Sequence, residues 1–198
     1  MIELLETAAS ALGPLAEEVG FLGGATIELW ITDPGAQAPR PTEDVDVIVE
    51  IGSYGQYAAV MPTSEEILGF SNRWYSSALA AVEERDLPSG ATIRAVPPVH
   101  LLATKIEAFQ GRGRGDFVAS HDFEDIVLLI NGRPELVAEI HAARTTWPEM
   151  MTFIVQAVRE MREDAYFSTG VHGVLAMRDP GRGRLIEEQL TAIAAIET

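Results

Sequence analysis

One stretch, residues 21–50, most constrains what this chain can fold into. A short apolar run leads into the pair Gly23 and Gly24, and a second apolar run surrounds and follows Asp44 and Asp46. The apolar runs predict two short strands, and the glycine pair between the first run and the next segment predicts a turn into a helix. Alternate residues of a strand point the same way, so Asp44 and Asp46 are expected side by side.

This pairing of glycines and aspartates has a chemical interpretation. Two neighbouring carboxylates repel each other unless a cation lies between them, and hard oxygen ligands suit Mg²⁺ or Mn²⁺. Gly23 and Gly24 would let bare backbone N–H groups approach a phosphate at a helix N-terminus. Each element alone is more often an ordinary turn or a strand-edge residue. Together they predict a metal site beside a phosphate cradle, which is the layout expected for nucleotidyl transfer.

The order of predicted elements indicates an α+β protein. The first half alternates short strands, turns and helices, and the chain becomes helical from Pro98 onward. A length of 198 residues suits one domain with an appendage or two small domains. We therefore expect a small mixed sheet with flanking helices in residues 1–97 and a helical C-terminal domain in residues 98–198 that completes the active site.

The acidity of the chain limits its partners. A net charge of −16 argues against a broad nucleic-acid-binding surface, which needs clustered lysine and arginine; the alternative is that the acidity only keeps the protein in solution. There is no cysteine, so neither disulfides nor thiolate metal sites are expected. No apolar run approaches the roughly 18 to 20 residues of a membrane span. These features predict a cytoplasmic protein with no membrane partner.

A second motif lies in residues 105–112, on a predicted helix. Lys105, Ala108 and Arg112 fall near one helix face, where the small Ala108 allows another element to come close. A lysine supplies a compact charge for a triphosphate, and an arginine grips a phosphate through two nitrogens. The alternative is an ordinary solvated helix face opposite a buried apolar side.

A third motif places Asp122 and Asp125 one helical turn apart, directly after Ser120. Ser120 or Asp122 would cap the N-terminus of the following helix, where carboxylates are favoured. Of the two aspartates, one would serve this cap and the other would orient Lys105 or meet the substrate.

Taken together, the three motifs resemble those of the DNA polymerase β-type nucleotidyltransferases of the abortive-infection AbiEii class, which includes toxins of toxin–antitoxin systems. The resemblance covers roughly residues 21–130. The positions of this sequence that match the family motifs are Gly23 and Gly24, Asp44 and Asp46, Lys105, Ala108 and Arg112, and Asp122.

The resemblance implies a nucleotidyltransferase-like fold and a set of roles in the first motif. Asp44 and Asp46 would be catalytic and would hold Mg²⁺ or Mn²⁺. Gly23 and Gly24, together with Thr42, would bind the nucleotide.

The resemblance extends these roles to the helical half. Lys105 and Arg112 would bind the nucleoside triphosphate, with Lys105 also catalytic, and catalytic Asp122 would position Lys105 or the acceptor. The implied reaction moves an NMP group from an NTP to a hydroxyl of an RNA, such as tRNA, or of a protein. The implied partners are a cognate antitoxin protein and, as an open alternative, further copies of the chain.

One departure from the family keeps a second function open. Family members usually carry a third carboxylate on a later strand, and the corresponding position here is Ala59, after a connection shorter than in relatives. That carboxylate commonly helps to hold the metal and to activate the attacking hydroxyl. The alternative is therefore a catalytically impaired family member that acts by binding a nucleotide or a partner protein.

Overall fold

A computed structural model describes residues 1–49, 72–113, 115–175 and 180–198. The chain forms two compact units, one of Met1–Leu29 with Pro39–Thr104 and the other of Trp30–Ala38 with Lys105–Thr198. The division falls inside helix α4 (Pro98–Gln110), whereas the sequence placed a boundary between residues 97 and 98.

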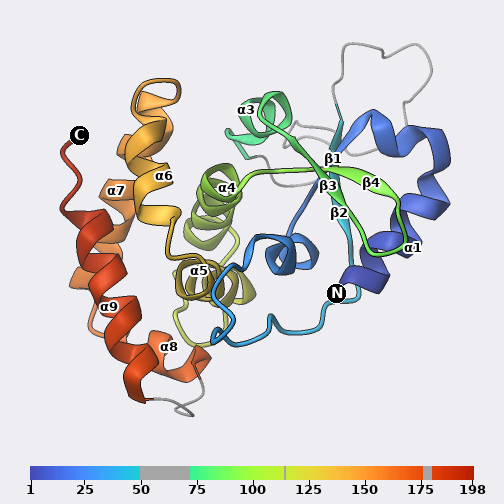
Figure 1. The fold of residues 1–198 in the computed structure, drawn as a ribbon. Helices are drawn as coiled ribbons and strands as arrows, with labels where there is room; N and C mark the ends of the chain where they lie inside the picture. Colours follow the sequence, from blue (N-terminus) through green and yellow to red (C-terminus); the bar gives the residue numbers. More distant parts are fainter. Residues whose placement is uncertain (50–71, 114, 176–179) are drawn as a thin grey trace. The chain divides into compact units, whose positions relative to one another are not determined.

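Among its described residues, the first unit contains a four-stranded mixed sheet with the strand order β2-β1-β4-β3 (Figure 1). Strand β1 pairs antiparallel with β2 and parallel with β4, while β3 pairs antiparallel with β4. The predicted α+β class with a small mixed sheet is thereby confirmed. The strands are β1 (Val19–Leu22), β2 (Asp46–Val49), β3 (Glu83–Asp86) and β4 (Thr92–Ala95).

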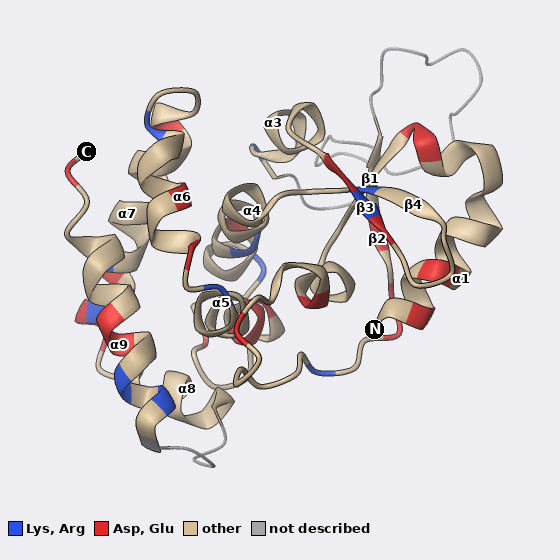
Figure 2. Ribbon diagram, viewed as in Figure 1, with Lys and Arg blue, Asp and Glu red and all other residues tan. Residues whose placement is uncertain are grey.

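The β3–β4 hairpin turns at residues 86–90, where proline, serine and glycine between two strand-like runs predict a hairpin turn. Leu87 N–H donates to the Ala91 carbonyl at 2.8 Å, and Gly90 adopts a φ of 86°, which a glycine tolerates without steric cost. In β4, Ile93 and Ala95 are buried, as expected for a strand with one face on a core. Charged side chains occupy β3 at the edge of the sheet (Figure 2).

Apolar residues at helical spacing predict one amphipathic helix over residues 2–18, but helix α1 (Ile2–Leu12) ends earlier. Gly13 has a φ of 55°, and Pro14 has no N–H to donate, so the chain leaves the α-helix and continues as a 3₁₀ helix, η1 (Gly13–Glu17). Both pack on the sheet. The buried core of this unit consists of Leu5, Ala9, Ala16, Val19, Phe21, Ala25, Leu87 and Ile93.

Two further helical segments of the chain flank the strands. The 3₁₀ helix η2 (Gly24–Trp30) follows β1, where the sequence predicted a short helix, and α3 (Tyr75–Ala80) precedes β3. Residues 57–61 have the sequence of a further short strand ended by Pro62, and they lie outside the described residues.

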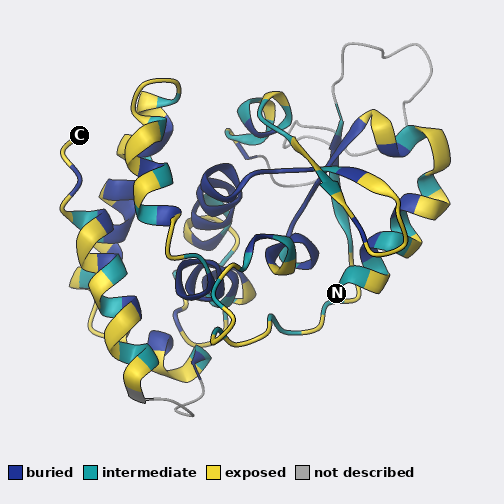
Figure 3. Ribbon diagram, in the orientation of Figure 1, coloured by how far each residue is buried: buried dark blue, intermediate teal, exposed yellow. Residues whose placement is uncertain are grey.

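The second unit is helical, and α5 is its most deeply buried helix (Figure 3). Helices α8 and α9 pack against α5, and α7 packs against α8 and α9; Ile154 of α7 and Ile186 of α9 are fully buried. Helix α8 is rich in glycine, serine and threonine, and the sequence did not predict it. The helices are α5 (His121–Gly132), α6 (Leu136–Ala143), α7 (Pro148–Glu163), α8 (Phe167–Val174) and α9 (Pro180–Ala194).

Four phenylalanines form a continuous aromatic cluster in the second unit. The Phe123 ring lies 5.3 Å from Phe109, 4.9 Å from Phe117 and 5.9 Å from Phe167, measured between ring centroids. These separations are those of favourable tilted and edge-to-face pairs. The cluster joins the end of α4 to α5 and α8, and it therefore fixes the helices that carry the second and third motifs.

No helix in the described parts of the chain has the length and apolar composition that a bilayer crossing requires.

The aromatic cluster generates a stability prediction. Phe123→Ala removes a fully buried ring that contacts three others, so the free energy of unfolding should fall by roughly 3–5 kcal/mol. Tyr166→Ala removes an aromatic side chain that is 67% exposed and should change it by about 0.5 kcal/mol or less. Urea unfolding followed by circular dichroism measures both, and equal losses would contradict the role given to the cluster.

Candidate functional site

The first candidate site brings Gly23 and Asp46 into direct contact. Gly23 follows β1 with a φ of 85°, and Asp46 begins β2 beside Leu22 in the antiparallel pair. A Cβ atom added to Gly23 would overlap Oδ2 of the Asp46 carboxylate. Only glycine meets both constraints here, because it accepts a positive φ and leaves room for the carboxylate. The two halves of the first sequence motif, about 20 residues apart in the chain, therefore meet.

The turn after Gly23 is held by Thr26. Both the backbone N–H and the hydroxyl of Thr26 donate to the Gly23 carbonyl, at 3.2 and 2.9 Å. Thr26 is fully buried, so these bonds fix the turn that opens η2 at Gly24. Sequence reasoning missed Thr26, and a hydroxyl residue three positions after a glycine at a strand end was the available signal.

Asp44 lies outside the strand, contrary to the expected side-by-side arrangement. Strand β2 begins at Asp46, and Asp44 is an exposed residue of the segment that leads into it. The backbone N–H of Asp44 donates weakly to the Thr42 hydroxyl at 3.4 Å. The alternation rule applies only within a strand, so it does not decide where the Asp44 carboxylate points.

The residues of this site suit a metal ion that arrives with a ligand. Within the residues described, no three His, Cys, Asp or Glu side chains gather closely enough to hold a metal ion. Mg²⁺ commonly binds through one or two carboxylates, several waters and the phosphates of a substrate, and it does not need a full protein cage. Asp44 and Asp46 fit that mode of binding.

The second candidate site is an ion cluster in the second unit. Lys105 Nζ lies 3.1 Å from Asp122 Oδ1 and 2.6 Å from Asp125 Oδ2. All three residues are buried. Lys105 belongs to α4 and both aspartates to the first turns of α5, so the cluster ties the two helices together. The sequence grouped the same residues but did not choose between the two aspartates as the partner of Lys105.

Arg112 completes this cluster from the exposed side. Its Nε donates to Asp122 Oδ2 and its Nη2 to Asp122 Oδ1, both at 3.0 Å, which is a two-point guanidinium–carboxylate contact. The Arg112 side chain is 52% exposed, whereas that of Asp122 is 9% exposed. The cap of α5 is Ser120, whose hydroxyl accepts from the Phe123 N–H at 3.3 Å. Asp122 therefore binds two cations and leaves the capping to Ser120.

The opposite charges of the cluster balance, and they shift the pKa values of Lys105 and Asp122. Burial works against the charged ammonium of Lys105, but Asp125 and Asp122 more than offset it and raise its pKa. Burial also works against the charged carboxylate of Asp122, but the hydrogen bonds from Arg112 and the charge of Lys105 lower its pKa. Two cations face two carboxylates, so neither cation stands unpaired and ready for a phosphate.

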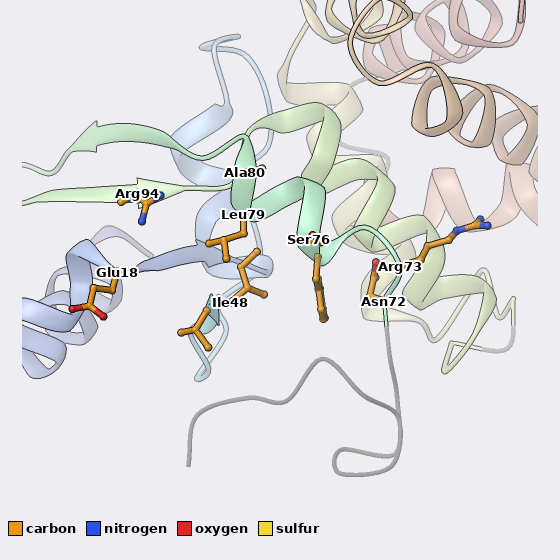
Figure 4. Close-up of a pocket in the computed structure, with 10 residues that line it drawn as sticks. Glu18, Ile48, Asn72, Arg73, Ser76, Leu79, Ala80 and Arg94 are labelled. Carbon is orange, nitrogen blue, oxygen red and sulfur yellow. The ribbon is translucent and has the colours of Figure 1, made fainter. Parts of the chain in front are cut away.

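A cleft of about 620 Å³ opens on the first unit beside β2, α3 and β4 (Figure 4). Ile48 and Leu79 lie in its middle, Glu18 and Arg94 at one end, and Asn72 at the other. The amide of Asn72 donates to the Thr104 carbonyl at 2.8 Å. The sequence did not single out these residues, which come from separate elements. Ala59, the position of the expected third carboxylate, lies outside the described residues.

No protein-family model, curated protein or solved structure matches this chain. The resemblance to the AbiEii class thus depends on the motif residues alone.

Two glycines provide a matched test of the Gly23–Asp46 contact. Gly23 and Gly90 have φ values of 85° and 86°, but a Cβ on Gly90 would meet nothing within 4 Å. Gly90→Ala should cost about 1–2 kcal/mol of unfolding free energy for its backbone conformation alone. Gly23→Ala should cost roughly 1–3 kcal/mol more, because its Cβ also overlaps Asp46.

Chemical denaturation of the two variants measures this difference. Adding Asp46→Ala to Gly23→Ala should recover most of the excess, since it removes the overlapping carboxylate. Equal losses at Gly23 and Gly90, or no recovery in the double variant, would show that the contact does not exist.

The lowered pKa of Asp122 predicts an acid dependence. A carboxyl group whose pKa is below its ordinary value of 3.8 in the folded protein stabilises the fold above that value. This stabilisation disappears as the pH falls from about 4 through the lower, folded pKa. Asp122→Asn should lose roughly 1.5–3 kcal/mol at neutral pH and depend less steeply on pH below 4. Urea unfolding between pH 2 and 7 measures this; parallel curves for the two proteins would exclude it.

Proposed function

We propose that this protein is a nucleotidyltransferase of the AbiEii type, which binds a nucleoside triphosphate with Mg²⁺ and moves its NMP group to a hydroxyl of an RNA or protein. The observation that supports this best is the contact between Gly23 and the Asp46 carboxylate at the neighbouring ends of β1 and β2. A glycine turn that opens a helical segment and a carboxylate of the kind that binds metal ions then lie within one small region.

The first unit would supply the phosphate and metal contacts. The backbone N–H groups of Gly23, which is buried, and Gly24, which is partly buried, would meet phosphate oxygens, and Thr42 precedes the aspartates on the segment that leads into β2. Asp44 and Asp46 would hold Mg²⁺, or Mn²⁺, together with the phosphates. The bound ion would offset negative charge on the phosphate oxygens during transfer.

Nucleotidyl transfer defines which bonds form and which bonds break. The acceptor hydroxyl oxygen forms a bond to the α-phosphorus, the bond from that phosphorus to the bridging oxygen of the β-phosphate breaks, and pyrophosphate leaves. The hydroxyl proton passes to a base or to solvent. The carboxylate of Asp46 is an acceptor at the site that can take this proton or order a water that does.

The ion cluster of the second unit is a separate candidate for a phosphate contact. Asp122 holds Lys105 and Arg112 in fixed positions, and the half-exposed Arg112 is the cation of the two that an anionic group can reach from solvent. An incoming phosphate would compete with Asp122 for the two-point contact of Arg112. Lys105 would then remain paired with Asp125.

A second function is favoured by the balanced charges of that cluster. Lys105 already has two carboxylate partners, and the family's third carboxylate is replaced by Ala59 in the sequence. Both features suit a catalytically impaired relative that binds a nucleotide or a partner protein, such as a cognate antitoxin. In a toxin–antitoxin or phage-defence system, a chain with either function would form a complex with its partner protein.

Transfer of label tests the enzyme. Purified protein with Mg²⁺ and each α-labelled NTP should label tRNA or a protein in cell extract, and Asp46→Ala should lower the rate at least 100-fold because the metal ligand is lost. Glu84→Ala, which removes an exposed carboxylate from β3 of the same unit, should leave the rate within twofold. Equal labelling by wild type and Asp46→Ala would end the assignment.

Calorimetry separates the two functions. Binding of an NTP with Mg²⁺ but no labelling of any acceptor supports the impaired relative, and Asp46→Ala should then weaken that binding at least tenfold. Absence of binding for every NTP would exclude both nucleotide roles and leave only partner binding.

A further inference from the structure

A second cleft, of about 350 Å³, lies entirely within the second unit. It is bordered by the C-terminal end of α5, the start of α6, one side of α9 and the segment 30–38, and α5 and α9 are neighbours in Figure 1. None of the residues assigned to nucleotidyl transfer lines it. The residues that matter for its chemistry are the apolar Val137, Leu185 and Ile186 and the polar Asp33, Asn131, Arg182 and Gln189.

Asn131 is the unusual residue of this cleft. It is 3% exposed, and neither its amide nitrogen nor its amide oxygen has a hydrogen-bond partner among the described residues. Buried polar groups almost always have partners, because an unpaired one loses its hydration without compensation. A buried amide with both of its functions unpaired, next to a cleft, therefore points to a group that the protein binds.

Gln189 adds a second unpaired amide group to the lining of this cleft. Its Oε1 atom is buried and also unpaired within the described part of the chain, and Gln189 lies on α9, whereas Asn131 lies on α5. Leu185, one turn before it, is 44% exposed. Asn131 thus contributes an unpaired donor and an unpaired acceptor, and Gln189 an unpaired acceptor, from two helices that line one cleft.

The charges around the cleft exclude an anionic ligand. Arg182 Nη1 is 2.6 Å from Asp33 Oδ2, and this ion pair lowers the pKa of Asp33. Glu188 lines the cleft as well, so its lining carries two carboxylates and one guanidinium. A phosphate or carboxylate ligand would meet net negative charge, whereas a neutral ligand would not.

We propose that this cleft binds a flat, neutral heterocycle of the nucleobase class, with the Asn131 amide pairing to an edge that carries a donor beside an acceptor. The side-by-side N–H and C=O functions of asparagine match the amino group and ring nitrogen of adenine. The apolar walls suit the two faces of such a ring, and the volume lies within the range of small-molecule sites. This inference is independent of the proposed transfer activity, because it uses none of the same residues.

Adenine titrated into the full chain tests the inference by calorimetry. Wild type should bind adenine, and it should bind N6,N6-dimethyladenine at least tenfold more weakly, since that molecule lacks the donor but keeps the ring. Asn131→Leu, which has a similar volume and no polar atoms, should weaken adenine binding at least tenfold. The same variant should unfold at an equal or higher temperature, because it removes an unpaired buried amide.

Matched variants place the binding site. Gln189→Leu should weaken adenine binding, whereas Gln156→Leu, on the exposed face of α7, should not. Asp46→Ala should leave adenine binding unchanged, because Asp46 belongs to the other unit. If Asn131→Leu fails to fold, the dimethyladenine and Gln189 results still decide.

Three outcomes would overturn the inference. They are no adenine binding up to its solubility, equal binding of adenine and its dimethyl derivative, and binding that Asn131→Leu and Gln189→Leu leave unchanged. If Asp46→Ala abolished adenine binding while both cleft variants kept it, adenine would occupy the proposed transfer site. That result would support the proposed function and reject this cleft.

Discussion

A buried lysine between two buried aspartates is the interaction on which the second unit depends. Burial of the Lys105 ammonium removes its hydration, which costs free energy. This cost is offset because Asp122 and Asp125 both lie within ion-pair distance. Loss of either carboxylate would leave part of the charge uncompensated in a region where water cannot screen it. The geometry of α4 and α5 at this junction is therefore fixed electrostatically, and the phenylalanine cluster around Phe123 fixes it again by packing.

The same balance limits the chemistry of the cluster. A cation that serves a substrate must release its protein partner or have charge to spare, and Lys105 has two partners while Arg112 shares one. Only Arg112 is exposed enough for exchange with a solution anion. The carboxylate of Asp122 thus forms the buried ion pair with Lys105 and also binds Arg112, the cation of the cluster that a solution anion can reach.

The sequence predicted those features that local chemistry decides. The hairpin around Gly90 follows from turn residues between two strand-like runs, and the Gly23–Asp46 pair follows from glycines and an aspartate at the ends of neighbouring strands. Helical spacing placed Lys105 and Arg112 on one helix face and Asp122 and Asp125 one turn apart. The link between Lys105 and these aspartates came from the hypothesis that one of them orients the lysine and from the resemblance to the AbiEii motifs.

Features decided by distant partners were not predictable in this way. Asp44 falls before β2 because that strand pairs with β1 only from Asp46 onward. Helix α8 has poor intrinsic helix formers and is held by contacts such as that of Phe167 with Phe123. The cleft around Asn131 has no sequence signature at all, since an asparagine near a helix end ordinarily indicates only a stop signal.

The discontinuity of the second unit has a consequence for how the chain acquires its structure. Residues 30–38 are made early, yet they belong with helices that end the chain, and Asp33 pairs with Arg182, 149 positions later. Contacts of such long sequence separation form late and slowly, because a large loop must close first. During synthesis this segment must wait for partners made much later: Thr32 and Asp33 donate to the Gly132 carbonyl, and Asp33 can pair with Arg182 only after that residue has been made. The first unit has all of its residues available by Thr104, so it can become ordered while the other is still being made.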